Sequence, residues 1–255
     1  MKNFLSALRN GFGFLTTIPV GISMEGIENL MKHIYLFPFV GAVLGIIFAV
    51  IGLISSVIFP PVLATLIIII SIYYFTGFNH IDGLADFGDG IAAHGTKEKK
   101  IEAMRDTAIG TGGLVFCILA ILGIFSILFF IAEINSQPLF LPFALIVAET
   151  AAKQSMVTIA AFGRRLHEGF GAMTVDNTKK SDFIIGMVVS CAVGYVFLGI
   201  FGIEAVIISQ LAGLLVLSTA NRHFGGVSGD VVGASNEIGR LSALFFIGGF
   251  AWMLL

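Results

Sequence analysis

The chain has 255 residues, of which 57% are apolar and only 12% are charged, and its mean hydropathy is +0.99. Soluble domains carry about 25% charged residues, so this composition excludes an ordinary soluble protein and requires a lipid bilayer to solvate much of the surface. The net charge of −2 provides no basic field for nucleic acid, and two cysteines are too few for a disulfide framework or a zinc site.

The first twenty residues are expected to form a short amphipathic helix at the membrane surface. Arg9, Asn10 and several glycines interrupt their apolar stretch, and no A-x-A cleavage site follows, so the features of a signal peptide are absent from this stretch. We assign the helix to an N-terminal segment, residues 1–32, on the cytoplasmic side of the membrane.

Seven apolar stretches follow that are candidates for membrane-spanning helices, which need about 20 apolar residues each. They are 33–59, 62–77, 112–132, 139–160, 183–202, 205–219 and 241–255. The sixth and the seventh are short and are expected to be tilted or to begin within the polar segments. The sequence therefore predicts an all-α, polytopic membrane helix bundle in which residues 1–255 form one catalytic domain.

The positions of Lys and Arg predict how these helices are oriented. Apart from Lys153, which lies within the fourth span, they gather before the first span and in the segments 78–111, 161–182 and 220–240. The three short connections 60–61, 133–138 and 203–204 contain none. Because cytoplasmic loops carry an excess of Lys and Arg, the N-terminus and the three long segments are expected on the cytoplasmic face of the cytoplasmic (inner) membrane.

The most informative polar segment follows the second predicted span and reads Asn79-His80-Ile81-Asp82-Gly83-Leu84-Ala85-Asp86-Phe87-Gly88-Asp89-Gly90. Asp82, Asp86 and Asp89 are spaced i, i+4 and i+7, so on a helix their carboxylates share one face. These like charges repel one another unless a cation binds, and Mg²⁺ suits carboxylates that act together with substrate phosphate. We predict that these three residues are catalytic and metal-binding, that His80 is a further catalytic candidate, and that the glycines let a bulky ligand approach the backbone.

The same segment continues to Arg105 and Asp106, which precede a glycine-rich turn. Arg105 is a candidate for binding phosphate through its guanidinium fork, and Asp106 is a candidate either for a metal ligand or for the partner of Arg105. An ordinary ion pair at the membrane interface is the alternative for both residues.

A second dense polar segment precedes the last predicted span. Asp230 and Glu237 are spaced i, i+7 and are predicted to be metal ligands. Arg222 and Asn236 are candidates for phosphate binding, and Gly229 lies at a helix start whose amide groups can hold phosphate oxygens.

Two further polar groups have less specific interpretations. Arg164 belongs to a basic segment that suits either an anionic substrate or the control of membrane topology. Glu149 and Lys153 are spaced i, i+4 in the fourth span and are expected to neutralise each other.

Four motifs in this order resemble the signature of the adenosylcobinamide-GDP ribazoletransferase family, also called cobalamin synthases. They are His80-x-Asp82-Gly83-Leu84-Ala85-Asp86-x-x-Asp89-Gly90, Met104-Arg105-Asp106 with Gly110, the Arg-rich segment 164–171, and Gly225-Gly226-x-x-Gly229-Asp230-x-x-Gly233-Ala234 with Glu237. The sequence Phe37-Pro38-Phe39-Val40-Gly41 is also similar to the start of the family's first span. The Phe87-Gly88 pair and Arg240 depart from the pattern, which leaves recognition details open.

The resemblance implies that the chain joins adenosylcobinamide-GDP to α-ribazole or its 5′-phosphate. The products would be adenosylcobalamin or its 5′-phosphate, together with GMP. The resemblance also implies a requirement for Mg²⁺ and a reaction at the cytoplasmic membrane. The expected partners are these two substrates and the lipid bilayer, with no nucleic acid, and a homo-oligomer remains open.

Two other functions compete with this interpretation. A CDP-alcohol phosphatidyltransferase also uses Asp-Gly motifs at a membrane surface. Its signature carries Ala-Arg shortly after Asp-Gly, whereas this chain has Asp86 where that Arg region would begin. A transporter or ion-binding membrane protein would have its polar residues along a path through the spans, whereas most polar residues here are predicted on one side.

Overall fold

The computed structural model describes residues 2–134 and 138–253, and within these ranges it contains helices and connections but no β-strand. The helices are α1 (Lys2–Leu15), α2 (Met24–Met31), the 3₁₀ helix η1 (Ile34–Leu36), α3 (Phe37–Ile58), α4 (Pro61–Thr76), α5 (Asn79–Ala92), α6 (Lys97–Met104), α7 (Thr111–Ile134), α8 (Phe140–Phe162), α9 (Phe170–Asn177), α10 (Lys180–His223) and α11 (Gly229–Met253). The predicted all-α class is therefore confirmed. Residues 135–137 of the predicted connection 133–138 and residues 254–255 of the seventh predicted span lie outside the described residues.

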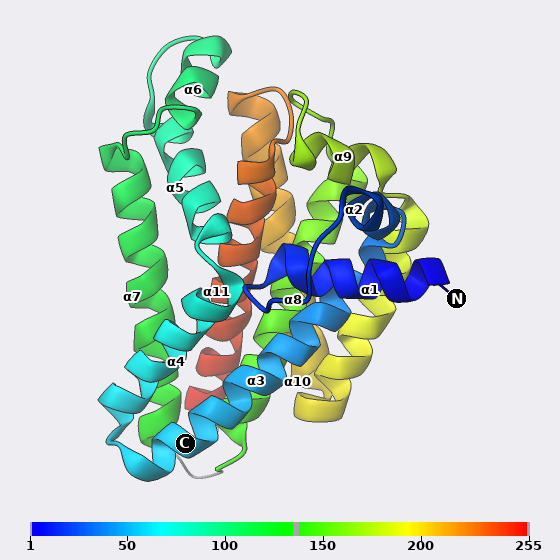
Figure 1. The fold of residues 1–255 in the computed structure, drawn as a ribbon. Coiled ribbons are helices and arrows are strands. Elements are labelled where there is room, and N and C mark those ends of the chain that lie inside the picture. Colours follow the sequence, from blue (N-terminus) through cyan, green and yellow to red (C-terminus); the bar gives the residue numbers. More distant parts are fainter. Residues whose placement is uncertain (1, 135–137, 254–255) are drawn as a thin grey trace.

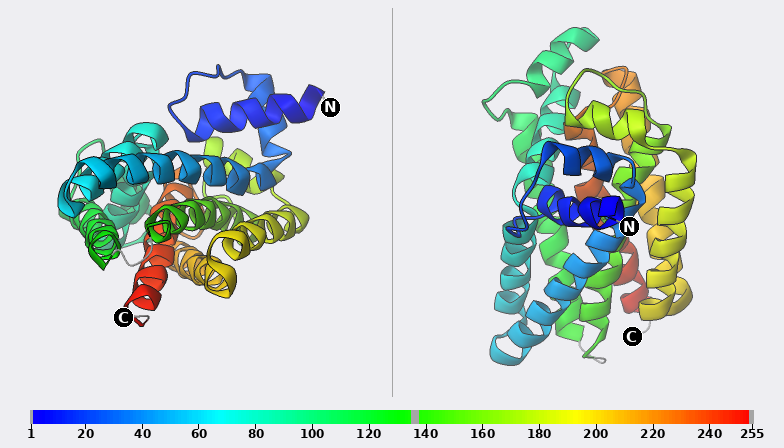
Figure 2. Two further views of the ribbon diagram at one scale, coloured as in Figure 1. Left: turned by 90° about the horizontal axis from the view of Figure 1, so that it is seen from below. Right: turned by 45° about the vertical axis from the view of Figure 1, so that its right-hand side comes forward.

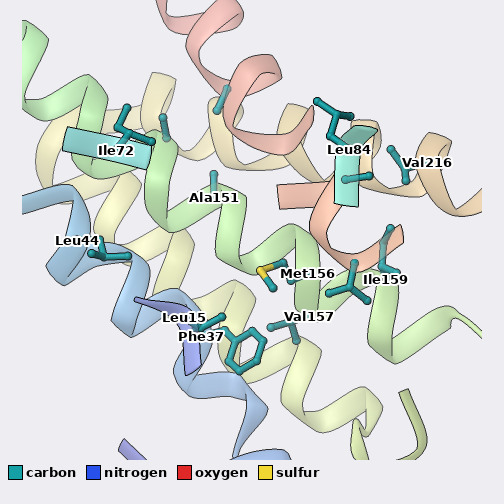
Figure 3. Close-up of a cluster of buried hydrophobic side chains, with 14 of the residues drawn as sticks. Leu15, Phe37, Leu44, Ile72, Leu84, Ala151, Met156, Val157, Ile159 and Val216 are labelled. Carbon is teal, nitrogen blue, oxygen red and sulfur yellow. The ribbon is translucent and has the colours of Figure 1, made fainter. Parts of the chain in front are cut away.

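The long helices form a bundle around α8 (Figures 1 and 2). Nearly every residue of α8 is buried, because α3, α10 and α11 pack around it. Figure 3 shows part of this core, where Ala151, Met156 and Val157 of α8 lie among side chains from other helices. A helix surrounded by protein instead of lipid can carry polar side chains, provided that they find partners.

The second predicted span ends at a sharp bend. Gly77 has φ +63°, a conformation that residues with a Cβ rarely adopt, and the axes of α4 and α5 differ by 91° across it. The first polar motif therefore lies on a helix, α5, rather than in an irregular loop. The segments 78–111 and 220–240, both expected as loops, are largely helical, since α11 already begins at Gly229.

Helix α10 contains the fifth and sixth predicted spans. Gly199 has φ +60° and interrupts the helical backbone. The backbones of Gly194 and Gly202 touch across this break, whereas eight residues of straight helix would separate them by about 12 Å. The chain therefore reverses direction near Gly199, and Figure 1 shows the two arms of α10 side by side in yellow and orange.

Within the described residues, four helical segments are long and apolar enough to cross a membrane: Ile34–Ile58, α7, α8 and α10. The bent pair α4–α5 would make a fifth. Helix α11 is not among them, and its first half carries Asp230, Glu237 and Arg240. A multi-pass membrane protein is thus supported, while the count of seven spans and the cytoplasmic N-terminus stay predictions.

The two N-terminal helices form a small cover on the side of the bundle, and α1 lies across the long helices (Figures 1 and 2). Asn10 of α1 is fully buried and accepts the backbone N–H of Ser23, which in turn caps α2 by accepting the N–H of Gly26. The N–H of Thr17 donates to the carbonyl oxygen of Phe75 at 2.8 Å. The cover is thereby attached to the bend that positions α5.

Candidate functional site

Two helices that are far apart in the sequence cross at the candidate site. Gly83 of α5 lies against the first turn of α11, where an added Cβ would stand 2.8 Å from the carbonyl oxygen of Asp230 and 3.0 Å from its Cα. Such distances leave no room for a side chain, so glycine at position 83 lets the two backbones touch. The crossing brings Asp82 and Asp86 of the first motif to Asp230 of the last motif.

A cavity of about 470 Å³ opens at this crossing. The carboxylates of Asp82, Asp86 and Asp230 line it, and Arg105 and Asp106 line it from the end of α6. Residues from three separate motifs therefore meet in one polar cavity, which is called the acidic cavity below.

The negative charges in the acidic cavity act on one another. Asp86 is half-buried, and the charges of Asp230, Asp82 and Asp89 all disfavour its ionised form. Among the described residues that line the cavity, Arg105 is the one cation. Asp82 is exposed, and Asp86 and Asp230 are half-buried, so water screens these charges in part, and a cation bound among them would relieve the repulsion that remains.

The donor set of the acidic cavity fits Mg²⁺. In the part of the chain that the structure describes, no three His, Cys, Asp or Glu side chains are close enough to hold a metal by themselves. Mg²⁺ is usually bound through one or two carboxylates together with waters and substrate phosphates, and not in an all-protein cage. One or two of the carboxylates of Asp82, Asp86 and Asp230 could therefore hold a Mg²⁺ ion that shares its coordination shell with a phosphorylated substrate.

Asp89 faces α7 instead of the acidic cavity. Its Oδ2 accepts the N–H of Gly110 at 2.7 Å, and its Oδ1 accepts the N–H of Gly113 at 2.8 Å. These amides lie at the start of α7, where backbone N–H groups have no partner within the helix and a negative charge is favourable. Asp89 thus caps α7 and does not line the acidic cavity with Asp82 and Asp86, although it is near enough for its charge to act on Asp86.

The glycines of the first motif contact neighbouring helices. An added Cβ at Gly88 would lie 2.9 Å from the carbonyl oxygen of Gly112 on α7, and one at Gly90 would collide with Met104. The prediction that these glycines and Gly83 let a bulky ligand approach the backbone is therefore wrong. Other parts of the protein fill the space that their missing side chains leave.

A second cavity of about 510 Å³ lies between the N-terminal cover and the crossing of α5 with α11. Its apolar wall includes Phe14, Leu15, Ile27, Phe37 and Met156. Its polar wall includes Asn79, His80, Asp82 and Asp230. Because Asp82 and Asp230 line both cavities, these two residues stand where the cavities adjoin.

His80 belongs to the polar wall of this second cavity. Its side chain is buried, and its Nδ1 has no hydrogen-bond partner among the described residues. Of the two cavities, Asp86 lines the acidic one and His80 lines the second, so these two predicted catalytic residues of the first motif lie in different, adjoining spaces.

Glu237 and Asn236 lie deeper in the bundle, in a buried polar network between α8 and α11. Glu237 Oε1 accepts a hydrogen bond from Arg240 Nη1 at 2.6 Å and another from Asn236 Nδ2 at 2.9 Å. The hydroxyl of Tyr73 donates to Glu237 Oε2 at 3.3 Å. The structure therefore does not bring these two residues into the acidic cavity.

The same network includes the ion pair that was expected in the fourth span. Lys153 Nζ donates to Glu149 Oε1 at 2.9 Å and to Asn236 Oδ1 at 2.7 Å, and Arg240 Nε donates to Glu149 Oε2 at 2.7 Å. Two carboxylates and two cations balance each other, so burial leaves no net charge. A buried ion pair of this quality offsets the cost of removing its charges from water.

The remaining predicted residues lie around the two cavities. Gly229 begins α11 and lines the second cavity. An added Cβ at this position would be in ordinary contact with the backbone N of Gly171, at 3.9 Å, so the site has room for a side chain. Arg164 is exposed, and its carbonyl oxygen accepts the N–H of Val227 at 2.7 Å, which ties the connection after α8 to the one before α11. Arg222 is exposed on the last turn of α10 and is not among the residues that line either cavity.

Sequence reasoning missed two features of this site. It counted Arg240 among the cytoplasmic charges, although Arg240 is fully buried in the network. The i, i+3 spacing of Glu237 and Arg240 was a usable signal, because it allows an ion pair on one helix. It also missed the apolar wall of the second cavity, since Phe14 and Phe37 belong to helices whose contact cannot be read from local spacing.

Comparison with known proteins agrees with these motifs. The family model described as cobalamin-5-phosphate synthase matches residues 7–248. The chain is 44% identical to the adenosylcobinamide-GDP ribazoletransferase of Methanosarcina barkeri and 42% identical to that of Methanosarcina mazei, with the whole of each chain aligned. It is 40% identical to the same enzyme of Methanococcoides burtonii over 97% of this chain and 93% of the relative. No solved structure matches. The resemblance is thus confirmed, and the chain belongs to the cobalamin-5-phosphate synthase family.

Proposed function

We propose that the chain joins adenosylcobinamide-GDP to α-ribazole or its 5′-phosphate, and releases GMP, in a late step of cobalamin synthesis. Membership of the family supports this assignment. The observation that carries it in the structure is the meeting of two cavities of different chemistry at Asp82 and Asp230. A transfer between two substrates needs two such adjoining sites, which hold the reacting groups together.

The acidic cavity is the proposed site of the pyrophosphate. Arg105 lies at the cavity and can contact phosphate oxygens through its guanidinium group. One or two of the carboxylates of Asp82, Asp86 and Asp230 would hold Mg²⁺ there together with the phosphate oxygens. When bound, this ion neutralises the charge of the pyrophosphate and of the leaving phosphate.

In the proposed step, a ribose hydroxyl oxygen of the ribazole forms a bond to the phosphorus atom attached to cobinamide. The bond between that phosphorus and the bridging oxygen breaks, and GMP leaves with the bridging oxygen. The hydroxyl proton passes to a group where the cavities adjoin, for which Asp82 and His80 are the candidates. Phosphoryl transfers of this kind depend mainly on positioning and charge neutralisation.

The test is an assay of the detergent-purified protein with adenosylcobinamide-GDP, α-ribazole and Mg²⁺, in which GMP and cobalamin are followed by mass spectrometry. We expect both products in equal amounts, and their loss with EDTA. Absence of both products from folded protein, with either form of ribazole, would contradict the proposed reaction and lead to tests of CDP-alcohol substrates. Unchanged turnover with EDTA would contradict the metal requirement alone.

A further inference from the structure

The second cavity is chemically unlike the acidic cavity, and this difference indicates what it binds. Seven apolar side chains of the described residues line it, and two of them, Phe14 and Phe37, are aromatic, with ring centroids 6.4 Å apart. Figure 3 shows Leu15, Phe37 and Met156 gathered on this side of the core. Small-molecule sites are commonly cavities of about 300–1,000 Å³ with apolar walls and a few polar groups, as here.

The charged side chains that line the two cavities indicate which substrate group each cavity binds. Among the described residues that line the second cavity, none is Lys or Arg, whereas Asp82 and Asp230 contribute negative charge. A pyrophosphate would find no cation in its walls, but Arg105 lines the neighbouring acidic cavity. The pyrophosphate of adenosylcobinamide-GDP therefore belongs in the acidic cavity, and the second cavity is left for the base and ribose of the nucleophile.

The size and polarity of the second cavity then indicate which part of the nucleophile it binds. A corrinoid macrocycle with its amide side chains is far too wide for a cavity of about 510 Å³. The methylated benzimidazole base of α-ribazole is flat and largely apolar, so it matches the wall that contains Phe14 and Phe37. A guanine carries donors and acceptors along one edge, and the polar groups of the cavity would then have to bind that edge instead of the ribose. A base held against Phe14 and Phe37 would leave its ribose at Asp82 and Asp230, where the cavities adjoin.

From this geometry we infer that the second cavity, between the N-terminal cover and the α5–α11 crossing, binds the aromatic base of the ribazole nucleoside. The inference rests on the proposed function for the identity of the ligand. Phe14 is then a specificity-determining residue, and the α1–α2 pair forms one side of a substrate site. The hydrogen bond from Thr17 to the α4–α5 bend keeps that side in register with Asp82.

The test compares Phe14→Ala with Phe4→Ala, which removes the same side chain from the same helix at an exposed position away from the cavity. We expect Phe14→Ala to raise the KM for α-ribazole about tenfold, because stacking of a base on an aromatic ring is lost. The KM for adenosylcobinamide-GDP should stay within about twofold, and Phe4→Ala should change neither value. A rise in the KM for adenosylcobinamide-GDP alone would place guanosine in the cavity, and unchanged KM values would exclude a base site there; either result overturns the inference.

A second measurement needs no variant and so does not depend on how Phe14→Ala folds. A ribazole analogue that lacks the two methyl groups of the base should bind the wild-type protein about tenfold more weakly in equilibrium dialysis, because less apolar surface is buried. Equal binding would overturn the inference. If the protein binds α-ribazole, Phe14→Ala weakens that binding and no cobalamin forms, the base site is supported and the proposed reaction is rejected. If cobalamin forms and Phe14→Ala leaves the KM values unaltered, the proposed reaction is supported and the base site is rejected.

Discussion

Asp86 and Asp89 lie one turn apart on α5, yet their surroundings are opposite. Asp86 shares the acidic cavity with Asp82 and Asp230, whose charges repel its own. Asp89 accepts two backbone N–H groups at the start of α7. Residues of the same type in the same motif therefore have different neighbours: Asp86 faces other carboxylates, and Asp89 accepts backbone N–H groups.

This contrast predicts opposite outcomes for two matched substitutions. Asp86→Asn should lower turnover at least about a hundredfold, as removal of a charge-stabilising group does, while thermal stability without Mg²⁺ stays equal or rises because a repulsion is removed. Asp89→Asn should destabilise the fold by about 1 kcal/mol through the weakened cap and leave the Mg²⁺ concentration for half-maximal activity unchanged. Thermal unfolding in detergent and Mg²⁺ titrations of activity measure both effects. A raised Mg²⁺ requirement in Asp89→Asn would show that Asp89 is a metal ligand.

At the scale of elements, α8 and α11 are held together by polar contacts inside an apolar bundle. Glu149 and Lys153 of α8 meet Glu237 and Arg240 of α11 in a network that is almost completely shielded from solvent. Polar contacts between helices have this role in membranes, because lipid provides no competing partners. The network also fixes the position of α11, whose first turn carries Asp230 into the acidic cavity.

Arg240→Met should therefore destabilise the protein by about 3–5 kcal/mol, because Glu149 and Glu237 keep only Lys153 as a cation. The control is Arg165→Gln, which removes an Arg–Asp176 pair of similar length whose side chains are 58% and 46% exposed, and should cost at most about 1 kcal/mol. Thermal unfolding in detergent gives both values. The double variant Arg240→Met with Glu237→Gln restores neutrality and should recover part of the loss. Equal losses for Arg240→Met and Arg165→Gln would contradict this account.

At the scale of the whole molecule, the connections that adjoin the basic residues of α6, of the segment 164–180 and of the end of α10 lie at one end of the bundle. The connection 93–96 with α6, the segment around α9 and the connection 224–228 all lie at the upper end in Figure 1, whereas the turn between α3 and α4 and the reversal of α10 lie at the lower end. The acidic cavity is bounded by α6 and therefore belongs to the upper end. That this end faces the cytoplasm stays a prediction, which rests on the positions of Lys and Arg in the sequence.

Cysteine labelling tests this topology in intact cells. In a variant without Cys117 and Cys191, a cysteine at Lys99 of α6 should be protected from a membrane-impermeant maleimide until the membrane is permeabilised. A cysteine at Pro138, before α8, should react at once. These outcomes follow from the bias of Lys and Arg toward cytoplasmic loops. The reverse pattern would place the N-terminus and the acidic cavity on the outer side.

The sequence by itself determined the class of the protein and indicated most of the polar residues that line the acidic cavity. Composition fixed an α-helical membrane protein, because in a bilayer a helix satisfies all its backbone hydrogen bonds internally. The i, i+4 spacing of Asp82 and Asp86 placed them on one helical face, and the order of the motifs indicated the family. All of these signals are local or compositional, so they do not depend on which helices become neighbours.

Only the tertiary structure decided which of the predicted residues meet. Local spacing grouped Asp89 with Asp82 and paired Glu237 with Asp230. In the structure, however, Asp89 accepts hydrogen bonds from the start of α7, and Glu237 accepts one from Arg240. The contact of Gly83 with Asp230 joins two helices from distant parts of the chain, and the apolar wall of the second cavity depends on how α1 and α3 pack. The direction that a side chain faces is set by helix periodicity, whereas its partner is set by helix packing, which no single segment of the sequence contains.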